Sequence, residues 1–272
     1  MKLIEVLGTR LEVHQIEAPT GLRPRAPIVF LHEGLGSVSM WRDRQGFWPA
    51  QVCAATGRGG VVYSRRGYGR SEPIPNVRGE PDERAGVRSG RLLPDYMQHE
   101  AWHTLPALLA QLHIDKPVLL GHSDGATIAL LHASRHPVAG CIVLAPHVMV
   151  EDVTLQAIAQ ARKAYETGTL RERLARHHLD VDNAFWQWND VWLSEGFRSF
   201  DIRPDLARIG APVLAIQGQD DPYGSMAQVD EIAAALPGRV VLHKLPGCGH
   251  APQREQMVPT TRLVRDFLDT VP

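Results

Sequence analysis

Residues 117–131 read PVLLGHSDGATIALL, and no other stretch of the chain says as much about its architecture. The first apolar run predicts a buried strand that ends near Gly121, and the second predicts a helix that begins just after Ser123. Between them Ser123 stands in the pattern G-x-S-x-G, which in this strand–turn–helix context predicts a nucleophile elbow. The turn is so tight that the residues two before and two after the serine must lack side-chain bulk, as Gly121 and Gly125 do. We expect the Ser123 hydroxyl to project from the sheet edge beside the helix N-terminus.

Length, charge and composition limit the classes of protein to which the chain can belong. It has 272 residues, a hydrophobic fraction of 44% and a formal net charge of −1. A chain of this length can bury one large core. No basic stripe or charge block favours nucleic acid or an anionic membrane as a partner. Because neither a signal-peptide core nor an 18-residue apolar stretch is seen, we expect a cytoplasmic protein.

The three cysteines, Cys53, Cys141 and Cys248, are widely spaced. They form neither a disulfide framework nor a C-x-x-C pair. We expect each to be a small buried side chain.

Apolar runs that alternate with helical patterns predict a parallel sheet covered by helices on both faces. Residues 2–16 predict a hairpin with its turn near Gly8-Thr9. Further strands are predicted at 26–31, 60–63, 117–121, 141–145, 212–216 and 239–243. Helices are predicted at about 39–55, 94–114, 124–135, 226–236 and 255–269, with an irregular loop at 72–93.

The alternation stops between residues 147 and 208, where only helical patterns occur. A helical insertion of this kind predicts a lid over the carboxyl edge of the sheet, where open α/β sheets bind their ligands. The predicted organisation is therefore a core of residues 1–146 and 209–272 with a helical lid at 147–208.

An alcohol is a weak nucleophile, so Ser123 requires a base, and the base requires a carboxylate that orients it. Asp220 and Asp221 follow one predicted strand, and His250 follows the next. The order serine, acid, histidine is the order expected after an elbow of this kind.

Over nearly its whole length the chain resembles the α/β-hydrolase superfamily. The matching pieces are the elbow, the acid turn, Gly249-His250, and the loops at residues 32–37 and 66–71. The resemblance implies a mostly parallel eight-stranded sheet with helices on both faces and a helical lid between strands 6 and 7. It also implies that Ser123 attacks, His250 shuttles the proton and Asp221 holds the imidazole, with Asp220 as the alternative acid.

The resemblance further implies an oxyanion hole made by the backbone N–H groups of Gly34 and Asp124. Glu33 stands where the family usually has glycine. Glu33 and Asp124 would then lie near developing negative charge, and we interpret both as held by structural hydrogen bonds. The alternative is a cationic substrate group near Asp124, because the Ser-Asp-Gly elbow is similar to that of valacyclovirase-like hydrolases, which favour esters of α-amino acids.

The predicted lid carries three tryptophans within eight residues: Trp186, Trp188 and Trp192. They either pack the lid onto the core or form an apolar wall for the substrate. Met149 is a further candidate for the substrate pocket.

A second pattern, His99-Glu100-Ala101-Trp102-His103, matches the H-E-x-x-H signature of zinc proteases. Two histidines four residues apart share a helix face, so both could bind one metal ion. No distinct third ligand follows at the usual spacings, and Pro106 comes soon after. We therefore expect a helix packed on the sheet, no metal, and a zinc-dependent hydrolase only as an alternative.

Together these features predict a cofactor-free serine hydrolase that cleaves an ester, thioester or lactone of a small molecule through an acyl-enzyme. Alternatives on the same residues are a cofactor-free haloperoxidase or perhydrolase, a hydrolase of carbon–carbon bonds, and a non-catalytic ligand receptor. The expected partner is a small-molecule substrate, with no nucleic acid and no membrane. Substrate identity and homo-oligomerisation are left open, since fold does not determine function.

Overall fold

The computed structural model describes residues 2–21, 23, 25–84 and 87–271. Its centre is an eight-stranded sheet with the order β1-β2-β6-β3-β9-β10-β11-β12. β1 and β2 pair antiparallel, as do β2 and β6, and every other pair in this sheet is parallel. The strands are β1 (Lys2–Val6), β2 (Thr9–Ile16), β3 (Ile28–Leu31), β6 (Gly60–Tyr63), β9 (Val118–His122), β10 (Gly140–Leu144), β11 (Val213–Gly218) and β12 (Val240–Leu245). The predicted mostly parallel sheet of eight strands is confirmed.

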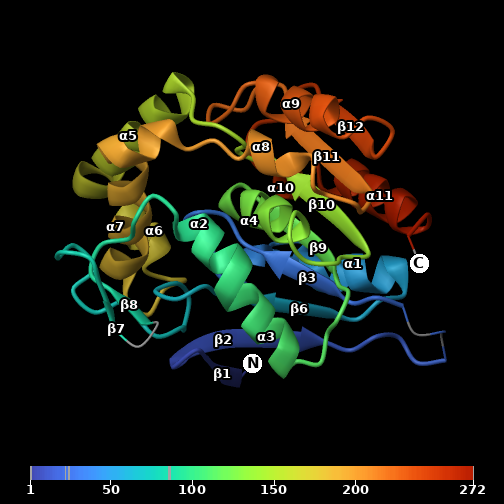
Figure 1. The fold of residues 1–272 in the computed structure, drawn as a ribbon, viewed down its shortest axis with the longest axis horizontal. Coiled ribbons are helices and arrows are strands. Elements are labelled where there is room, and N and C mark those ends of the chain that lie inside the picture. Colours follow the sequence, from blue (N-terminus) through green and yellow to red (C-terminus); the bar gives the residue numbers. More distant parts are fainter. Residues whose placement is uncertain (1, 22, 24, 85–86, 272) are drawn as a thin grey trace.

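Alternate residues of the buried strands enter two separate cores, because successive side chains in a strand point to opposite faces. In β3, Val29 and Leu31 pack in one core with α3 (Leu105–Gln111), α4 (Asp124–Ala133) and α9 (Ala227–Ala235). Ile28 and Phe30 pack in the other core with α1 (Trp48–Thr56) and α11 (Met257–Leu268). Figure 1 shows α3 and α4 crossing one face of the sheet. Continuous apolar strands are what a sheet covered on both faces requires.

Two of the predicted helices begin or end elsewhere. The helix predicted from residue 39 begins at Trp48, and Pro49 lies in its first turn, where a missing N–H costs no hydrogen bond. Before it lie a 3₁₀ turn at Val38–Trp41 and a short hairpin of β4 (Arg42–Asp43) and β5 (Gly46–Phe47). The closing helix is divided at Gln256 into α10 (Pro252–Glu255) and α11.

The segment predicted as one helix at 94–114 contains a π-helical turn. α2 (Tyr96–His99) runs into a π-helical stretch at Glu100–Thr104 and then into α3. Pro106 lies in the first turn of α3, so the helix passes through this proline instead of ending before it. A proline ring clashes with the carbonyl four residues earlier in a regular helix, and the wider turn provides room for it. The preceding 72–93 segment, predicted to be irregular, carries a small hairpin of β7 (Asp82–Arg84) and β8 (Val87–Ser89).

Between β10 and β11 the chain forms only helices. They are α5 (Asp152–Thr167), α6 (Leu170–Leu174), α7 (Val181–Trp192), a 3₁₀ turn at Glu195–Ser199 and α8 (Arg203–Leu206). A single β-bridge between Met149 and Asp201 joins the two ends of this insertion. Figure 1 shows α5, α6 and α7 as a group beside the sheet. The helical content is as predicted, whereas the role of residues 147–208 as a lid stays a prediction.

No helix in the described part of the chain is long and apolar enough to cross a membrane.

Candidate active site

Ser123 occupies a strained turn between β9 and α4. Its φ of 54° and ψ of −122° lie outside the regions that side-chain-bearing residues usually adopt. A Cβ at Gly121 would lie 2.2 Å from the carbonyl oxygen of Gly125, and one at Gly125 would lie 2.1 Å from that of Leu31. Both obstacles are backbone atoms, so both glycines are required for the turn to close. The Ser123 N–H donates to the Leu144 carbonyl at 2.9 Å, which ties the turn to the end of β10.

His250 and Asp221 complete a line of hydrogen bonds that starts at the serine. The Nε2 atom of His250 lies 3.0 Å from the Ser123 Oγ, and its Nδ1 lies 2.8 and 2.9 Å from the two Asp221 oxygens. A carboxylate accepts only, so Nδ1 carries the proton and Nε2 is free to accept one from the serine. Three chain segments far apart in sequence thus place a hydroxyl, an imidazole and a carboxylate in the order needed to make the hydroxyl nucleophilic.

The Asp221 carboxylate is fixed and kept charged by three donors. Gln217 Nε2 donates to Oδ2 and the Tyr223 N–H donates to Oδ1, both at 2.8 Å, in addition to the bonds from His250. Burial alone would raise the pKa of Asp221, but the hydrogen bond and charge of His250 hold this pKa below its usual value of 3.8. The neighbouring Asp220 is exposed, and its backbone N–H donates to the Cys248 carbonyl. Of the two acids left open by the residue order, the structure therefore brings Asp221 to His250.

The two residues whose backbone N–H groups are expected to form an oxyanion hole line the same cavity. Gly34, Ser123 and Asp124 all line it. Within the described residues, neither the Gly34 N–H nor the Asp124 N–H donates to another protein atom. Gly34 also has no room for a side chain, since a Cβ there would lie 2.2 Å from the Trp188 Nε1. Two unengaged N–H groups are thus available to an oxygen atom near Ser123.

Arg65 holds the loop that carries Gly34. Its guanidinium donates to the carbonyls of His32 at 2.6 Å and Glu33 at 3.1 Å. Burial keeps the pKa of His32 well below 6.5, so its neutral ring donates from Nδ1 to the Glu33 carbonyl and accepts from the Arg65 N–H at Nε2. These contacts fix the backbone of the loop at Glu33, the position where the family usually has glycine. Nothing in the sequence around Arg65 marked it for this role.

Glu33 lines the cavity around Ser123, and its carboxylate lies beside two basic side chains. It lies 3.4 Å from the His122 Nδ1 and 3.4 Å from the Arg254 Nη2. Burial would raise the pKa of Glu33, but the His122 hydrogen bond and the Arg254 charge hold this pKa well below 4.5. His122 also donates from Nε2 to the backbone carbonyl of His250 at 2.7 Å. Glu33 thus helps to position the segment that carries His250.

The Asp124 carboxylate is almost fully buried, at 1% exposed. The Tyr96 hydroxyl donates to it at 2.5 Å, and the Arg65 Nη2 lies 3.9 Å away. Tyr96 in turn accepts a hydrogen bond from the Trp192 indole at 2.9 Å. Burial raises the pKa of Asp124, an effect that the Arg65 charge opposes. The Asp124 carboxylate therefore has partners within the protein, which agrees with its interpretation as a structural group.

The walls of the cavity around Ser123 are mostly apolar. Its volume is about 440 Å³ including its open mouth, and its apolar walls include Leu35, Ile158, Trp188, Trp192 and Tyr223. Trp188 and Trp192 come from α7, four residues apart and thus on one face of that helix. The sequence singled out both tryptophans, but neither Leu35 nor Ile158.

Two other predicted pocket residues lie elsewhere. The ring of Trp186 lies under the Arg78 guanidinium, 3.9 Å from its central carbon, and packs edge-on against Tyr165 and Phe185. It lies two positions from Trp188, which on a helix is a different face. Met149 belongs to the β-bridge at the base of the insertion, and Gln228 bonds both its backbone N–H and its carbonyl. Neither Trp186 nor Met149 lines the cavity around Ser123, so a role for them in substrate binding stays a prediction.

His147 is a wall residue that the sequence analysis did not identify. Its side chain is 2% exposed, lines the cavity, and lies 5.8 Å from the His250 ring, centre to centre. Burial lowers the pKa of His147 to about 3, so the ring is neutral at physiological pH. Its position directly after the end of β10 was the available signal, because ligands meet such sheets at the carboxyl ends of strands.

The H-E-x-x-H segment begins at His99, the last residue of α2, and continues through the π-helical turn. Glu100 is buried and accepts a hydrogen bond from the Tyr63 hydroxyl at 2.6 Å, while the His99 and His103 rings lie 5.2 Å apart. Among the residues that the structure describes, no group of three or more potential ligands could hold a metal ion.

The eight-stranded sheet, the turn at Ser123 and the hydrogen-bonded side chains of Ser123, His250 and Asp221 together define a class of protein. The chain belongs to the α/β hydrolase family, whose model matches residues 28–262. It is 27% identical to RutD of Pseudomonas savastanoi pv. phaseolicola over 90% of this chain and 94% of that protein. It is also 27% identical to the serine hydrolase BPHL of Homo sapiens over 76% of this chain and 68% of that protein. These relatives support an enzyme of the hydrolase class.

Solved structures agree on the fold. The enol-lactonase from Burkholderia xenovorans LB400 superimposes with a TM-score of 0.69 at 21% identity, over 98% of this chain and 99% of that one. A thermophilic esterase from Thermogutta terrifontis gives 0.72 at 19% identity, over 99% of each chain.

Proposed function

We propose that the protein is a cofactor-free serine hydrolase that cleaves the ester bond of a small, neutral carboxylic ester or lactone. The observation that carries this proposal is the unbroken hydrogen-bonded line from the Ser123 Oγ through His250 to Asp221, at the wall of a cavity. The geometry meets the requirements of an activated nucleophile, in which a base lies within hydrogen-bond reach and is itself oriented.

In the proposed reaction the Ser123 oxygen attacks the carbonyl carbon while its proton passes to the His250 Nε2. The carbonyl oxygen, now negative, accepts from the Gly34 and Asp124 N–H groups. Collapse of this intermediate expels the alcohol, which takes the proton from His250, and leaves an acyl-enzyme on Ser123. Water then gives its proton to His250 and attacks the acyl carbon, and His250 returns the proton to Ser123 as the acid leaves.

The choice of a neutral substrate rests on the cavity. Its walls are mostly apolar, and two carboxylates line it, of which Glu33 already lies beside His122 and Arg254. The other, the buried Asp124 next to the serine, already has Tyr96 and Arg65 as partners. A cationic substrate group would compete with a buried guanidinium for this carboxylate. We therefore expect no preference for esters of α-amino acids.

The test is a substrate panel run on the wild type and on Ser123→Ala. It contains neutral esters, thioesters, lactones, and one α-amino acid ester with its des-amino analogue. We expect hydrolysis of the neutral esters, no gain from the amino group, and a loss of several orders of magnitude in kcat for the variant. Retained activity in Ser123→Ala would contradict the proposal. Peroxide- and acetate-dependent bromination of a dye in place of esterolysis would indicate a perhydrolase, and ligand binding without turnover would indicate a receptor.

A further inference from the structure

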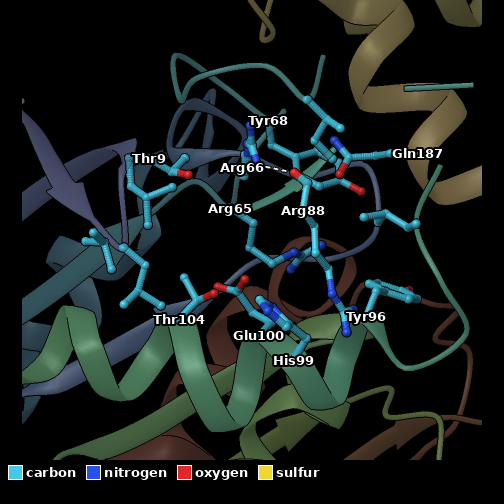
Figure 2. A pocket seen from close by; sticks show the side chains of 15 residues that line it. Thr9, Arg65, Arg66, Tyr68, Arg88, Tyr96, His99, Glu100, Thr104 and Gln187 are labelled. Carbon is cyan, nitrogen blue, oxygen red and sulfur yellow. Dashed lines mark hydrogen bonds between the residues drawn. The ribbon is translucent and has the colours of Figure 1, made fainter. Parts of the chain in front are cut away.

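A second cavity lies on the other side of Arg65 and Tyr96 from the first. Its volume is about 720 Å³ including its mouth, and it lies between the β1–β2 hairpin, the loop after β6 and the helical segment that starts with α2. No described residue lines both cavities. Arg65 and Tyr96 separate them, since both line the second cavity and both contact Asp124, which lines the first. Figure 2 shows the second cavity from close by.

One end of this cavity holds three polar groups without partners. The Arg66 Nε, the Tyr68 hydroxyl and the Gln187 Nε2 are each enclosed and make no hydrogen bond within the described chain. Tyr68 and Gln187 are both 2% exposed. A Cβ at Gly67, which lies between Arg66 and Tyr68, would be 2.2 Å from the Gln187 Nε2, so this amide lies against the backbone that joins the other two residues. Figure 2 shows them on the same side of the cavity. Buried donors left unpaired are costly and rare, so together they indicate an acceptor that belongs there.

The acceptor that fits is an anion, because no described carboxylate is in contact with Arg66. Its Nη1 donates to the Arg88 carbonyl, but no described carboxylate lies within ion-pair distance of it. Burial lowers the pKa of Arg66, and the charge of Glu72, which lies beyond ion-pair distance, opposes this effect only in part. The other two arginines that line the cavity are paired, Arg65 with Asp124 and Arg88 with Asp95.

The carboxylate that faces this cavity is otherwise occupied. Glu100 accepts from the Tyr63 hydroxyl, and burial raises the pKa of Glu100. It therefore opposes an incoming anion less than a free carboxylate would.

Apolar side chains form a further part of the lining. They are those of Val6, Leu7, Leu11, Ile74 and Leu92, and Leu7 is half exposed. We propose that this cavity binds a small monocarboxylate with an apolar tail, such as a medium-chain or phenyl-substituted acid. The carboxylate accepts from Arg66, Tyr68 and Gln187, and the tail lies along the apolar walls. Neither this site nor its test depends on the proposed catalytic function.

The test is calorimetric titration of the full-length protein with octanoate, using octanol as the neutral probe. Gln187→Glu replaces the amide by a carboxylate of nearly the same shape. This carboxylate puts a negative charge where the carboxylate of the ligand would bind. We expect this variant to bind octanoate at least about tenfold more weakly, since like charges in an enclosed site repel strongly. Its melting temperature should not fall, because Arg66 gains a partner.

Two matched variants locate the binding. Gln160→Glu makes the same change on the exposed surface of α5, and Leu35→Glu adds a carboxylate to the cavity around Ser123. We expect both to bind octanoate as the wild type does. Absence of octanoate binding in the wild type, equal binding of octanol, undiminished binding in Gln187→Glu, or loss in Leu35→Glu would each overturn the proposal.

Discussion

Replacing Asp221 by asparagine should disable the site through the hydrogen-bond pattern alone. The position of Oδ1 must accept from the Tyr223 N–H, so the new amide nitrogen takes the position of Oδ2. That nitrogen then faces two donors, the Gln217 Nε2 at 2.8 Å and the His250 Nδ1 at 2.8 Å. A His250 ring with its proton on Nε2 relieves this clash, and such a ring can no longer accept a proton from Ser123.

We expect kcat for a neutral ester to fall about 10³–10⁴-fold in Asp221→Asn, which is a loss of about 4–5.5 kcal/mol of transition-state stabilisation. Asp220→Asn is the matched control, because its carboxylate is exposed and does not contact His250. Its kcat should stay within about threefold of the wild type, as for most surface changes. Steady-state kinetics near pH 8, with thermal melts to verify folding, measure both variants. A tenfold or smaller loss in Asp221→Asn, or an equal loss in Asp220→Asn, would refute the assignment of the acid.

Three further predictions concern stability. Gly125→Ala places a methyl group 2.1 Å from the Leu31 carbonyl oxygen and should lower the melting temperature by about 5–10 °C. Gly210→Ala, whose methyl group enters open space, should leave the melting temperature unchanged, and equal melting temperatures for the two variants would contradict the prediction. Tyr96→Phe leaves the buried Asp124 carboxylate without its hydroxyl donor and should lower the free energy of unfolding in urea by about 1–3 kcal/mol. A decrease below about 0.5 kcal/mol would show that this hydrogen bond contributes little to stability. Burial lowers the folded-state pKa of His132, His147 and His178, so below pH 6.5 the unfolded chain binds more protons than the folded one. The free energy of unfolding should therefore fall by about 1–2 kcal/mol for each of these residues between pH 6.5 and pH 5. A melting temperature that holds or rises from pH 7.5 to 5 would contradict this.

The elbow could be predicted from the sequence because its cause is local. A strand, a serine between two glycines and a helix follow each other within fifteen residues, and the close approaches at Gly121 and Gly125 depend on that short stretch and its neighbouring strand. The same holds for the alternation of strands and helices, which gave the sheet. By contrast, the helical periodicity carried no sign of the π-helical turn that precedes Pro106.

The surroundings of the serine were predicted only in part. Trp188 and Trp192 share a face of α7 and Trp186 does not, so helical spacing alone could have removed Trp186 from the pocket. The partners of Asp124 could not be found this way. Tyr96 and Arg65 lie 28 and 59 residues away along the chain, and only the packing of α2 and of the loop after β6 on the elbow brings them together.

The most direct test of an activated Ser123 is labelling with a fluorophosphonate probe, followed by peptide mass spectrometry, on the wild type and on His250→Ala. We expect one probe molecule on Ser123 in the wild type, and labelling at least about a hundredfold slower in the variant, which lacks the base. A wild-type protein that stays unlabelled while folded, or a His250→Ala variant that labels as fast as the wild type, would contradict it.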